Sequence, residues 1–384
     1  MWSVAWTVRT CWTVPGVNDQ LVLPNYSGAN VRGLIPALLA PPRVPLPSWF
    51  PQGADTAQRV VLVIDGLGWE QLQDRLHLAP TLASMTGSPI TTVAPSTTAT
   101  ALTSITTGLT PAEHGLIGYR FDVGGEILNV LRWRGDRNDL RRSHPPRDLQ
   151  PYAPFLGESP PVISRAELES SAFTEAHLRG SRPMGWRSSS AIAIEIGRQL
   201  AAGERLVYAY YDGIDKTAHE RGFGDYYDAE LVTVDRLVSD VLDQIPDDAA
   251  LLITADHGQV QVGSNIVQLG DELLAMVRIQ SGEGRFRWLH ARPGAHRDLL
   301  AAATEDHGSR AWVVSRTQTI DEGWFGPAMS APVAGRLGDV ALVARDPISF
   351  FDPADSGPYE LVCRHGSLTI AEMLVPLLVA RGRR

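Results

Sequence analysis

Three apolar segments of the chain each end in an aspartate, and residues that can bind metal ions follow two of them. The segments run from Arg59 to Asp65, from Leu206 to Asp212 and from Ala250 to Asp256. Asp215 follows the second segment closely, and His257 directly follows the third. Buried parallel strands have continuous apolar sequences, and open α/β sheets bind their ligands beyond the carboxyl ends of the strands. The pattern therefore predicts an active site at that edge of a sheet.

The spacing of Asp215 and His219 fits a shared metal ion. Side chains four residues apart on a helix lie on one face, where a carboxylate and an imidazole can bind the same ion. A solvent-exposed pair would give the same spacing. Asp65, which precedes a glycine turn, could equally cap a helix, and His365 could be an ordinary loop histidine. The conjunction of all these residues in one chain favours a metal site.

Thr98 is the candidate nucleophile. A threonine hydroxyl is too weakly acidic to attack unaided, so it needs an adjacent base or a metal ion. The residues before it, Pro95 and Ser96, predict the end of a strand and the N-cap of a threonine-rich helix. Free backbone N–H groups at a helix N-terminus favour a phosphate oxygen. For Thr97 and Thr100 we favour capping and packing roles.

The remaining pattern predicts an α/β fold with a mixed, mostly parallel central sheet flanked by helices. We expect residues 1–25 to be an N-terminal leader and residues 26–384 to form one catalytic domain. Residues 120–185 are rich in Pro, Arg and Ser, and residues 264–345 alternate apolar with polar residues between turns. We expect two insertions there, the second forming a smaller β-containing cap. Helices are expected at about residues 30–39, 69–85, 98–107, 188–202 and 226–245.

Composition excludes several classes of protein. The net charge of −9 argues against binding a nucleic-acid polymer, which requires clustered Lys and Arg, and the chain has a single lysine, Lys216. No apolar stretch reaches the roughly 20 residues of a spanning helix, so we expect no membrane span. Cys11 and Cys363 cannot make a disulfide framework. Without a recognisable secretion signal, the expected location is cytoplasmic.

Several motifs together resemble the alkaline phosphatase superfamily, most closely its nucleotide pyrophosphatase/phosphodiesterase branch. They are, in chain order, Asp65, PSTT ending at Thr98, TTGLTPAEHG, Asp215 with His219, ADHG, and RHG followed by EMLVPLL. The resemblance covers about residues 30–120, 185–262 and 345–384. It implies an alkaline phosphatase-like core and a site for two divalent metal ions. By the resemblance, one ion is bound by Asp65, Thr98, Asp256 and His257, and the other by Asp215, His219 and His365.

The resemblance also implies the activity. Thr98 would attack phosphorus in line, and water would hydrolyse the resulting phospho-threonine. Zinc suits a mixed set of carboxylates and imidazoles, although Mn²⁺ or Fe²⁺ could occupy such a site. The implied partner is a small-molecule phosphate ester, possibly a nucleotide. The sequence leaves open both the physiological ester and the oligomeric state.

Two positions depart from the phosphodiesterase branch. Its nucleophile is typically followed by an aromatic residue that stacks on a nucleobase and, two positions later, by an asparagine that binds phosphate. Here these positions are Ala99 and Ala101. Residues of the insertions, such as Tyr119 or Trp133, could compensate. The departures weaken the assignment of a nucleotide substrate and leave the hydrolase class intact.

Other classes of function make different demands on the sequence. A sulfatase needs cysteine or serine in a C/S-x-P-x-R context, which PSTTATA lacks. A phosphomonoesterase or a phosphonate-bond hydrolase could use the same two-metal core, since specificity comes from the surrounding pockets. A non-catalytic protein that binds phosphate ligands predicts a broken ligand set, whereas all seven positions hold suitable residues. We therefore expect a phosphodiesterase or nucleotide pyrophosphatase, with these hydrolases as alternatives.

Overall fold

The computed structural model describes residues 21–41, 43–355 and 360–384. Residues 1–20 of the expected leader, including Cys11, lie outside this part of the chain. Residues 21–25 of the expected leader are described, and the backbone N–H of Val22 donates to the carbonyl of Leu368 at 2.9 Å.

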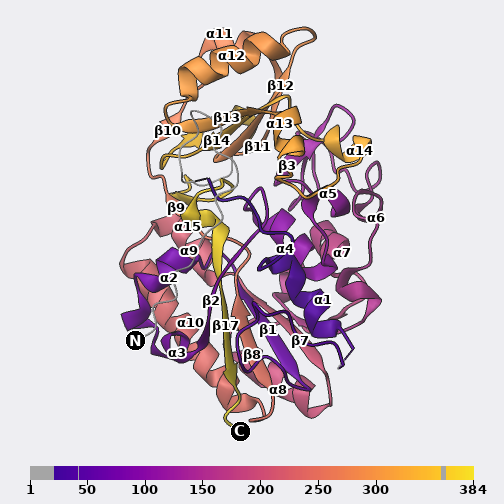
Figure 1. Ribbon diagram of the computed structural model, residues 1–384, viewed down its shortest axis with the longest axis vertical. Helices are drawn as coiled ribbons and strands as arrows, with labels where there is room; N and C mark the ends of the chain where they lie inside the picture. Colours follow the sequence, from indigo (N-terminus) through magenta and orange to yellow (C-terminus); the bar gives the residue numbers. More distant parts are fainter. Residues whose placement is uncertain (1–20, 42, 356–359) are drawn as a thin grey trace.

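The core is a seven-stranded sheet in the order β2-β17-β8-β1-β7-β5-β6 (Figure 1). All neighbouring strands are parallel except β17, which runs antiparallel to both β2 and β8. The mixed, mostly parallel sheet expected from the sequence is therefore confirmed. Its strands are β1 (Arg59–Ile64), β2 (Thr86–Thr91), β5 (Pro161–Ile163), β6 (Arg182–Pro183), β7 (Leu206–Tyr211), β8 (Ala250–Thr254) and β17 (Leu374–Arg381).

The three segments that end in aspartate are central strands of this sheet. β1 lies between β7 and β8, and its register pairs Ile64 with Tyr211 and Val63 with Thr254. The strands are almost entirely buried, which explains their continuous apolar sequences. Because the three strands are parallel and end together, the polar residues that follow them meet at one edge of the sheet.

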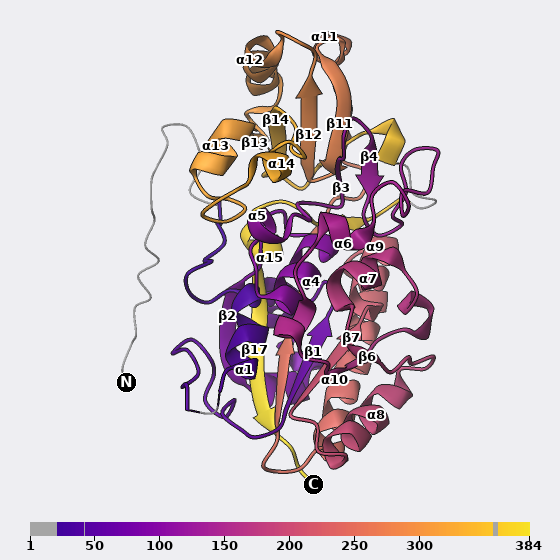
Figure 2. The same cartoon turned by 90° about the vertical axis from the view of Figure 1, so that its right-hand side faces the viewer.

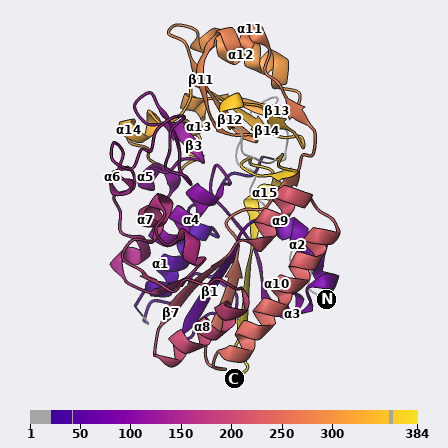
Figure 3. The same ribbon diagram turned by 180° about the vertical axis from the view of Figure 1, so that it is seen from behind.

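Helices cover both faces of the sheet (Figures 1 and 3). One group packs around α10 and includes α8, α9 and α3, and the other packs around α4 and includes α1 and α7. The helices of the core are α1 (Leu34–Leu39), α2 (Trp69–Gln73), α3 (Pro80–Ser84), α4 (Thr98–Thr107), α5 (Pro111–His114), α6 (Pro146–Leu149), α7 (Ala172–Leu178), α8 (Ser190–Ala201), α9 (Gly213–Arg221), α10 (Asp225–Gln244) and α15 (Ile370–Met373). Short 3₁₀ helices are η1 (Val31–Gly33), η2 (Leu76–Leu78), η3 (Pro154–Gly157), η4 (Ala166–Leu168) and η5 (Pro353–Asp355).

Two local expectations were wrong. The helix expected over residues 69–85 is three short helices, α2, η2 and α3. Pro80 begins α3, where its missing N–H costs nothing, whereas inside a continuous helix it would break the hydrogen-bond ladder. The N-cap of α4 is Thr97, one residue later than the expected Ser96, and the hydroxyl of Ser96 instead donates to the carbonyl of Ser367 at 2.7 Å.

Residues 120–185 do not form a single insertion outside the sheet. Within them, β5 and β6 extend the central sheet beyond β7. Their brevity, with three and two residues, explains why apolar periodicity did not reveal them. The first part of the region is a hairpin of β3 (Arg120–Asp122) and β4 (Ile127–Asn129).

A second, four-stranded antiparallel sheet lies above the core, in the order β11-β12-β14-β13 (Figure 2). It has an apolar cluster of its own, built around Leu289, Leu342 and Phe350. We call residues 264–350 the cap. Its elements are β10 (Ile266–Val267), α11 (Asp271–Ala275), β11 (Val277–Glu283), β12 (Phe286–Ala291), α12 (His296–His307), β13 (Ala311–Ser315), α13 (Arg316–Asp321), α14 (Ala331–Ala334), β14 (Val340–Ala344) and β15 (Ser349–Phe350).

Buried ion pairs connect the cap to the core. Arg285, in the turn between β11 and β12, binds both carboxylate oxygens of Glu372 at 2.7 and 2.8 Å, and both side chains are fully buried. A short antiparallel pair, β9 (Val260–Gln261) with β16 (Cys363–Arg364), lies at the same junction. Among the described residues, no helix is both long and apolar enough to cross a membrane.

Candidate active site

The seven residues predicted from the sequence come together where the cap meets the carboxyl edge of the sheet. Asp65 follows β1, and Asp256 and His257 follow β8. Asp215 and His219 lie on α9, which begins directly after β7. His365 follows β16, and Thr98 is the first residue of α4.

One group consists of Asp65, Asp256 and His257, whose ligand atoms all lie within 4.8 Å of one another. Nε2 of His257 is 3.6 Å from Oδ1 of Asp65 and 3.4 Å from Oδ2 of Asp256. All three side chains are buried. The hydroxyl of Thr98 is 3.1 Å from the same Nε2, so the candidate nucleophile adjoins this group.

A second group consists of Asp215, His257 and His365, again within 4.8 Å. His219 adjoins it, with Nε2 3.2 Å from Oδ1 of Asp215. The rings of His257 and His365 are stacked, with centroids 3.6 Å apart. The resemblance assigned His257 to one ion only, whereas the geometry places it between the two groups.

Backbone carbonyls orient the three imidazoles. Nδ1 of His219 is 2.6 Å from the carbonyl of Cys363, and Nδ1 of His257 is 3.0 Å from that of Gly258. Nδ1 of His365 is likewise 3.0 Å from the carbonyl of Ser96. With Nδ1–H donating to these carbonyls, each neutral ring leaves Nε2 as an acceptor facing the site, as is common for histidine ligands.

The carboxylates of the first group suit a bound cation. Oδ1 of Asp65 and Oδ2 of Asp256 are buried and have no hydrogen-bond partner in the described structure. Burial, followed by repulsion from Asp256 and Asp215, raises the pKa of Asp65 well above its usual value. Burial also raises the pKa of Asp256. A buried cluster of negative charge is costly unless a cation compensates it, so these donors fit a divalent metal ion.

In the second group, imidazoles outnumber carboxylates. Burial lowers the pKa of His365 well below its ordinary value, and the neighbouring His257 and His219 lower it further, which keeps an imidazole available as a ligand. Burial opposes ionisation of Asp215, but the charge and hydrogen bond of His219 hold the pKa of Asp215 below its usual range. The donor set of mixed carboxylate and imidazole fits a second ion.

Three neighbouring side chains were not predicted from the sequence. The hydroxyl of Tyr210 donates to Oδ2 of Asp65, and Nε2 of Gln259 donates to Oδ1 of Asp215 at 2.8 Å. Glu283 reaches the site from the end of β11, with Oε2 3.7 Å from Nδ1 of His365. The positions of Tyr210 at a strand end and Gln259 beside ADHG were available signals, whereas nothing in the sequence places Glu283 there.

Asp212, the third aspartate at a strand end, belongs to neither group. Its carboxylate pairs with Arg165 at 2.7 Å and with Lys216 at 2.5 Å. Two cations therefore neutralise Asp212 without a metal ion. The carboxylate remains beside the site as the N-cap residue of α9.

Ala99 and Ala101 are fully buried, so neither methyl group is exposed to a substrate. Trp133 is also fully buried, and its indole N–H donates to the carbonyl of His144 at 2.7 Å. Trp133 therefore cannot stack on a base, contrary to the expectation from the sequence. Tyr119 is partly exposed and lines a cavity beside the cap.

The fold and the site define a hydrolase of phosphoric esters. Family comparison gives the same class, since the sequence model for type I phosphodiesterases/nucleotide pyrophosphatases matches residues 59–368. The chain belongs to this family, a branch of the alkaline phosphatase superfamily. No curated protein sequence matches the chain.

Two solved structures show the same fold. Murine ectonucleotide pyrophosphatase/phosphodiesterase 5, as an inactive threonine-to-alanine variant in complex with AMP, is 13% identical with a TM-score of 0.62, and the match covers 84% of this chain and 87% of that chain. Phosphonoacetate hydrolase from Sinorhizobium meliloti 1021 in complex with phosphonoformate is 16% identical with a TM-score of 0.61, covering 85% and 91%.

Proposed function

We propose that the protein is a metal-dependent phosphodiesterase or nucleotide pyrophosphatase that acts through a phospho-threonine at Thr98. The observation that carries the proposal is the convergence of Thr98, at the start of α4, with two groups of metal-ligand side chains. The inactive threonine-to-alanine variant among the structural neighbours supports a catalytic threonine. The proposed ligands are Asp65, Thr98, Asp256 and His257 for one ion, and Asp215, His219 and His365 for the other.

In the proposed reaction, the oxygen of Thr98 forms a bond to phosphorus as the bond to the leaving oxygen breaks. The leaving oxygen takes the electron pair, and water then cleaves the phospho-threonine and restores the hydroxyl. When bound, two divalent ions, which we propose are zinc, would lower the pKa of the hydroxyl and neutralise charge on the phosphoryl group. The backbone N–H of Thr98, at the N-terminus of α4, would donate to a phosphoryl oxygen.

Phosphonate hydrolysis is the second candidate. Phosphonoacetate hydrolase has the same fold, and the buried Ala99 and Ala101 remove two nucleotide contacts typical of the phosphodiesterase branch. Both reactions place a negatively charged phosphoryl group at the same donors. They differ in the bond that breaks and in the group that leaves.

Hydrolysis by the zinc-loaded protein tests the assignment. We expect faster turnover of bis-(p-nitrophenyl) phosphate than of p-nitrophenyl phosphate, and Thr98→Ala serves as the inactive control. A preference for the monoester would move the assignment to a phosphatase. Turnover of phosphonoacetate without turnover of either ester would establish the phosphonate alternative instead.

A further inference from the structure

The turn between β11 and β12 brings a cap side chain to the candidate active site. Glu283, the last residue of β11, is only 7% exposed. Its Oε2 atom is 3.7 Å from Nδ1 of His365, and its Oε1 atom is buried with no hydrogen-bond partner in the described structure. Because a buried polar atom without a partner is destabilising, the position of Glu283 points to a functional role.

Glu283 also lies against the loop that contains the nucleophile. The side chain of Thr97, which directly precedes Thr98, is adjacent to the carboxyl group of Glu283. Glu283 packs on Gly366 as well, where a Cβ would lie 2.7 Å from Cγ of Glu283. One cap side chain therefore contacts both the segment that leads to Thr98 and the segment that contains His365.

These two segments are bonded to each other. Nδ1 of His365 is 3.0 Å from the carbonyl of Ser96. The backbone N–H of Gly366 donates to Oγ of Ser96 at 3.2 Å, and the N–H of Ser96 donates to the carbonyl of Gly366 at 3.2 Å. A shift of His365 would therefore also move the backbone that leads to Thr98.

The same turn holds the next residue of the His365 segment. Arg285 pairs with Glu372, and Oε1 of Glu372 also accepts a hydrogen bond from the backbone N–H of Ser367 at 2.9 Å. The hydroxyl of Ser367 donates to the carbonyl of Ala344, at the end of β14 of the cap. The turn of residues 283–285 therefore contacts residues 365 and 366 directly and residue 367 through Glu372.

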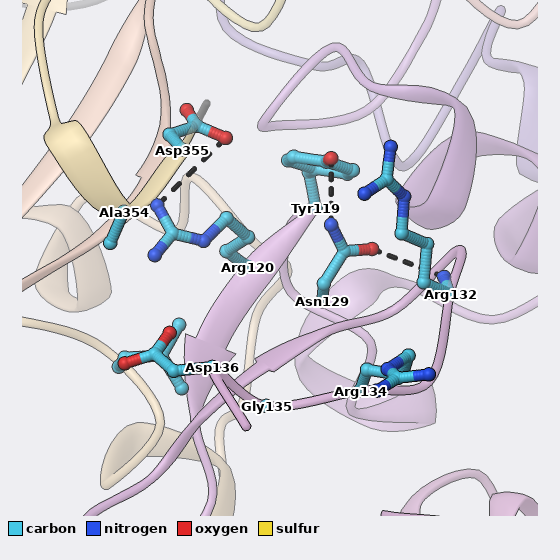
Figure 4. Close-up of a pocket in the computed structure, with 10 residues that line it drawn as sticks. Tyr119, Arg120, Asn129, Arg132, Arg134, Gly135, Asp136, Ala354 and Asp355 are labelled. Atoms are coloured by element: carbon cyan, nitrogen blue, oxygen red, sulfur yellow. Dashed lines mark hydrogen bonds and ion pairs between the residues drawn. The ribbon is translucent and has the colours of Figure 1, made fainter. Parts of the chain in front are cut away.

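Ion pairs fix the strand that follows the turn. Arg287, on β12, is 3.3 Å from Asp352 and 2.9 Å from Asp355. Both aspartates also pair with Arg120 of β3, at 2.6 and 3.8 Å, and Figure 4 shows Asp355 beside Arg120. Because these side chains are largely buried, dissolved salt screens their attraction little. The turn is therefore held in place against the core before any ligand binds.

We propose that Glu283 is a positioning residue through which the cap fixes His365 and the backbone before Thr98. The proposal rests on the proposed function, in which His365 binds the second ion, and adds that the cap forms part of that metal site. Groups that contact a ligand histidine away from the metal orient its ring, and their loss typically weakens metal binding by about 10- to 100-fold. Truncation of Glu283 should therefore act on one ion and spare the other.

The zinc affinity of Glu283→Ala tests the proposal without any measurement of turnover. Competition with a chromophoric chelator gives the dissociation constant of each ion. We expect one ion to be bound about 10- to 100-fold more weakly and the other to be bound as in wild type. Glu272→Ala removes an exposed acid of the cap and should bind both ions as wild type does. Unchanged binding of both ions, or equal weakening of both, would overturn the proposal.

Glu283→Gln separates positioning from a general disturbance of the cap. Glutamine has nearly the same shape and keeps an oxygen that can accept a hydrogen bond, so it should retain most of the affinity that Glu283→Ala loses. With Co²⁺ in place of zinc, visible absorption reports the geometry of the ligands. We expect the spectrum to change in Glu283→Ala and to be restored in Glu283→Gln. A wild-type spectrum in Glu283→Ala, or an equal loss of affinity in both variants, would refute the positioning role.

The two proposals can fail separately. If wild-type protein binds two zinc ions but hydrolyses no ester, the proposed function fails while the binding measurements still decide the role of Glu283. If wild-type protein hydrolyses esters and Glu283→Ala binds both ions normally, the proposed function stands and the role of Glu283 is refuted.

Discussion

The hydroxyl of Thr98 lies 3.1 Å from Nε2 of His257, although the two residues are 159 positions apart in the chain. One begins a helix, and the other follows a central strand. His257 is also common to both groups of metal-ligand side chains. The candidate nucleophile is therefore placed at the point where the two proposed metal sites meet.

Substitution of a proposed ligand should remove metal. Asp256→Asn takes away a buried carboxylate that has an unpartnered oxygen, so we expect the content of zinc to fall from two ions per chain to one. Asp212→Asn is the matched control, since that aspartate also follows a central strand but is neutralised by Arg165 and Lys216. Metal content is measured by plasma mass spectrometry. Two ions retained in Asp256→Asn would contradict the proposed ligand.

The ion pair of Arg285 and Glu372 should matter for stability. Both side chains are fully buried, so Arg285→Met leaves a carboxylate without its cation, and we expect a loss of about 3–5 kcal/mol in the free energy of unfolding. Arg236→Met breaks an exposed pair with Asp240 and should cost under about 1 kcal/mol. Urea denaturation measures both. Equal effects of the two variants would show that the buried pair has no special role.

Gly366 should not tolerate a side chain. Its φ is 121°, and a Cβ there would lie 2.6 Å from Cδ of Glu283. Gly366→Ala should therefore displace the adjacent His365 and weaken binding of the second ion. Gly263→Ala is a control, because Gly263 also has positive φ but its Cβ would meet no atom within 4 Å. If Gly366→Ala binds two ions with wild-type affinity, the close packing of Glu283 against Gly366 is unimportant.

Part of the fold and part of the candidate site could be predicted from the sequence. Continuous apolar sequences predicted β1, β7 and β8, and parallel strands necessarily bring Asp65 and Asp256 to one edge. The end of α4 was also predictable, because glycine is common after the last residue of a helix. Gly108 indeed adopts the left-handed conformation there.

The rest depends on contacts between distant segments. Glu283 reaches the site only because the cap folds back onto the core, a tertiary arrangement that local pattern does not encode. The short strands β5 and β6 carry too few residues for an alternation to be visible. Trp133 is an error in the other direction. As an aromatic residue in a loop it suggested a ligand contact, but its side chain is fully buried.

Stability should fall in mild acid because of His114. Burial lowers the pKa of His114 to about 3, and its Nδ1 accepts a hydrogen bond from the N–H of Leu116. Below about pH 6.5 the unfolded histidine binds a proton that the folded one does not. The free energy of unfolding therefore decreases as the pH is lowered, by about 1.4 kcal/mol per pH unit. In the variant His114→Gln, the side chain at this position does not bind a proton in either state. Between pH 6.5 and 5 wild type should therefore lose about 2 kcal/mol more than the variant in chemical denaturation, whereas parallel pH profiles would contradict this account.

The role of Thr98 as nucleophile is tested most directly by turnover of bis-(p-nitrophenyl) phosphate in Thr98→Ala, compared with Thr100→Ala. Thr100 lies in the same helix, and its buried hydroxyl has no partner, so its loss should leave turnover close to wild type. We predict that Thr98→Ala remains folded and loses at least about a thousandfold in kcat, as expected when a nucleophile is removed. Turnover in Thr98→Ala close to that of wild type would contradict the proposed mechanism.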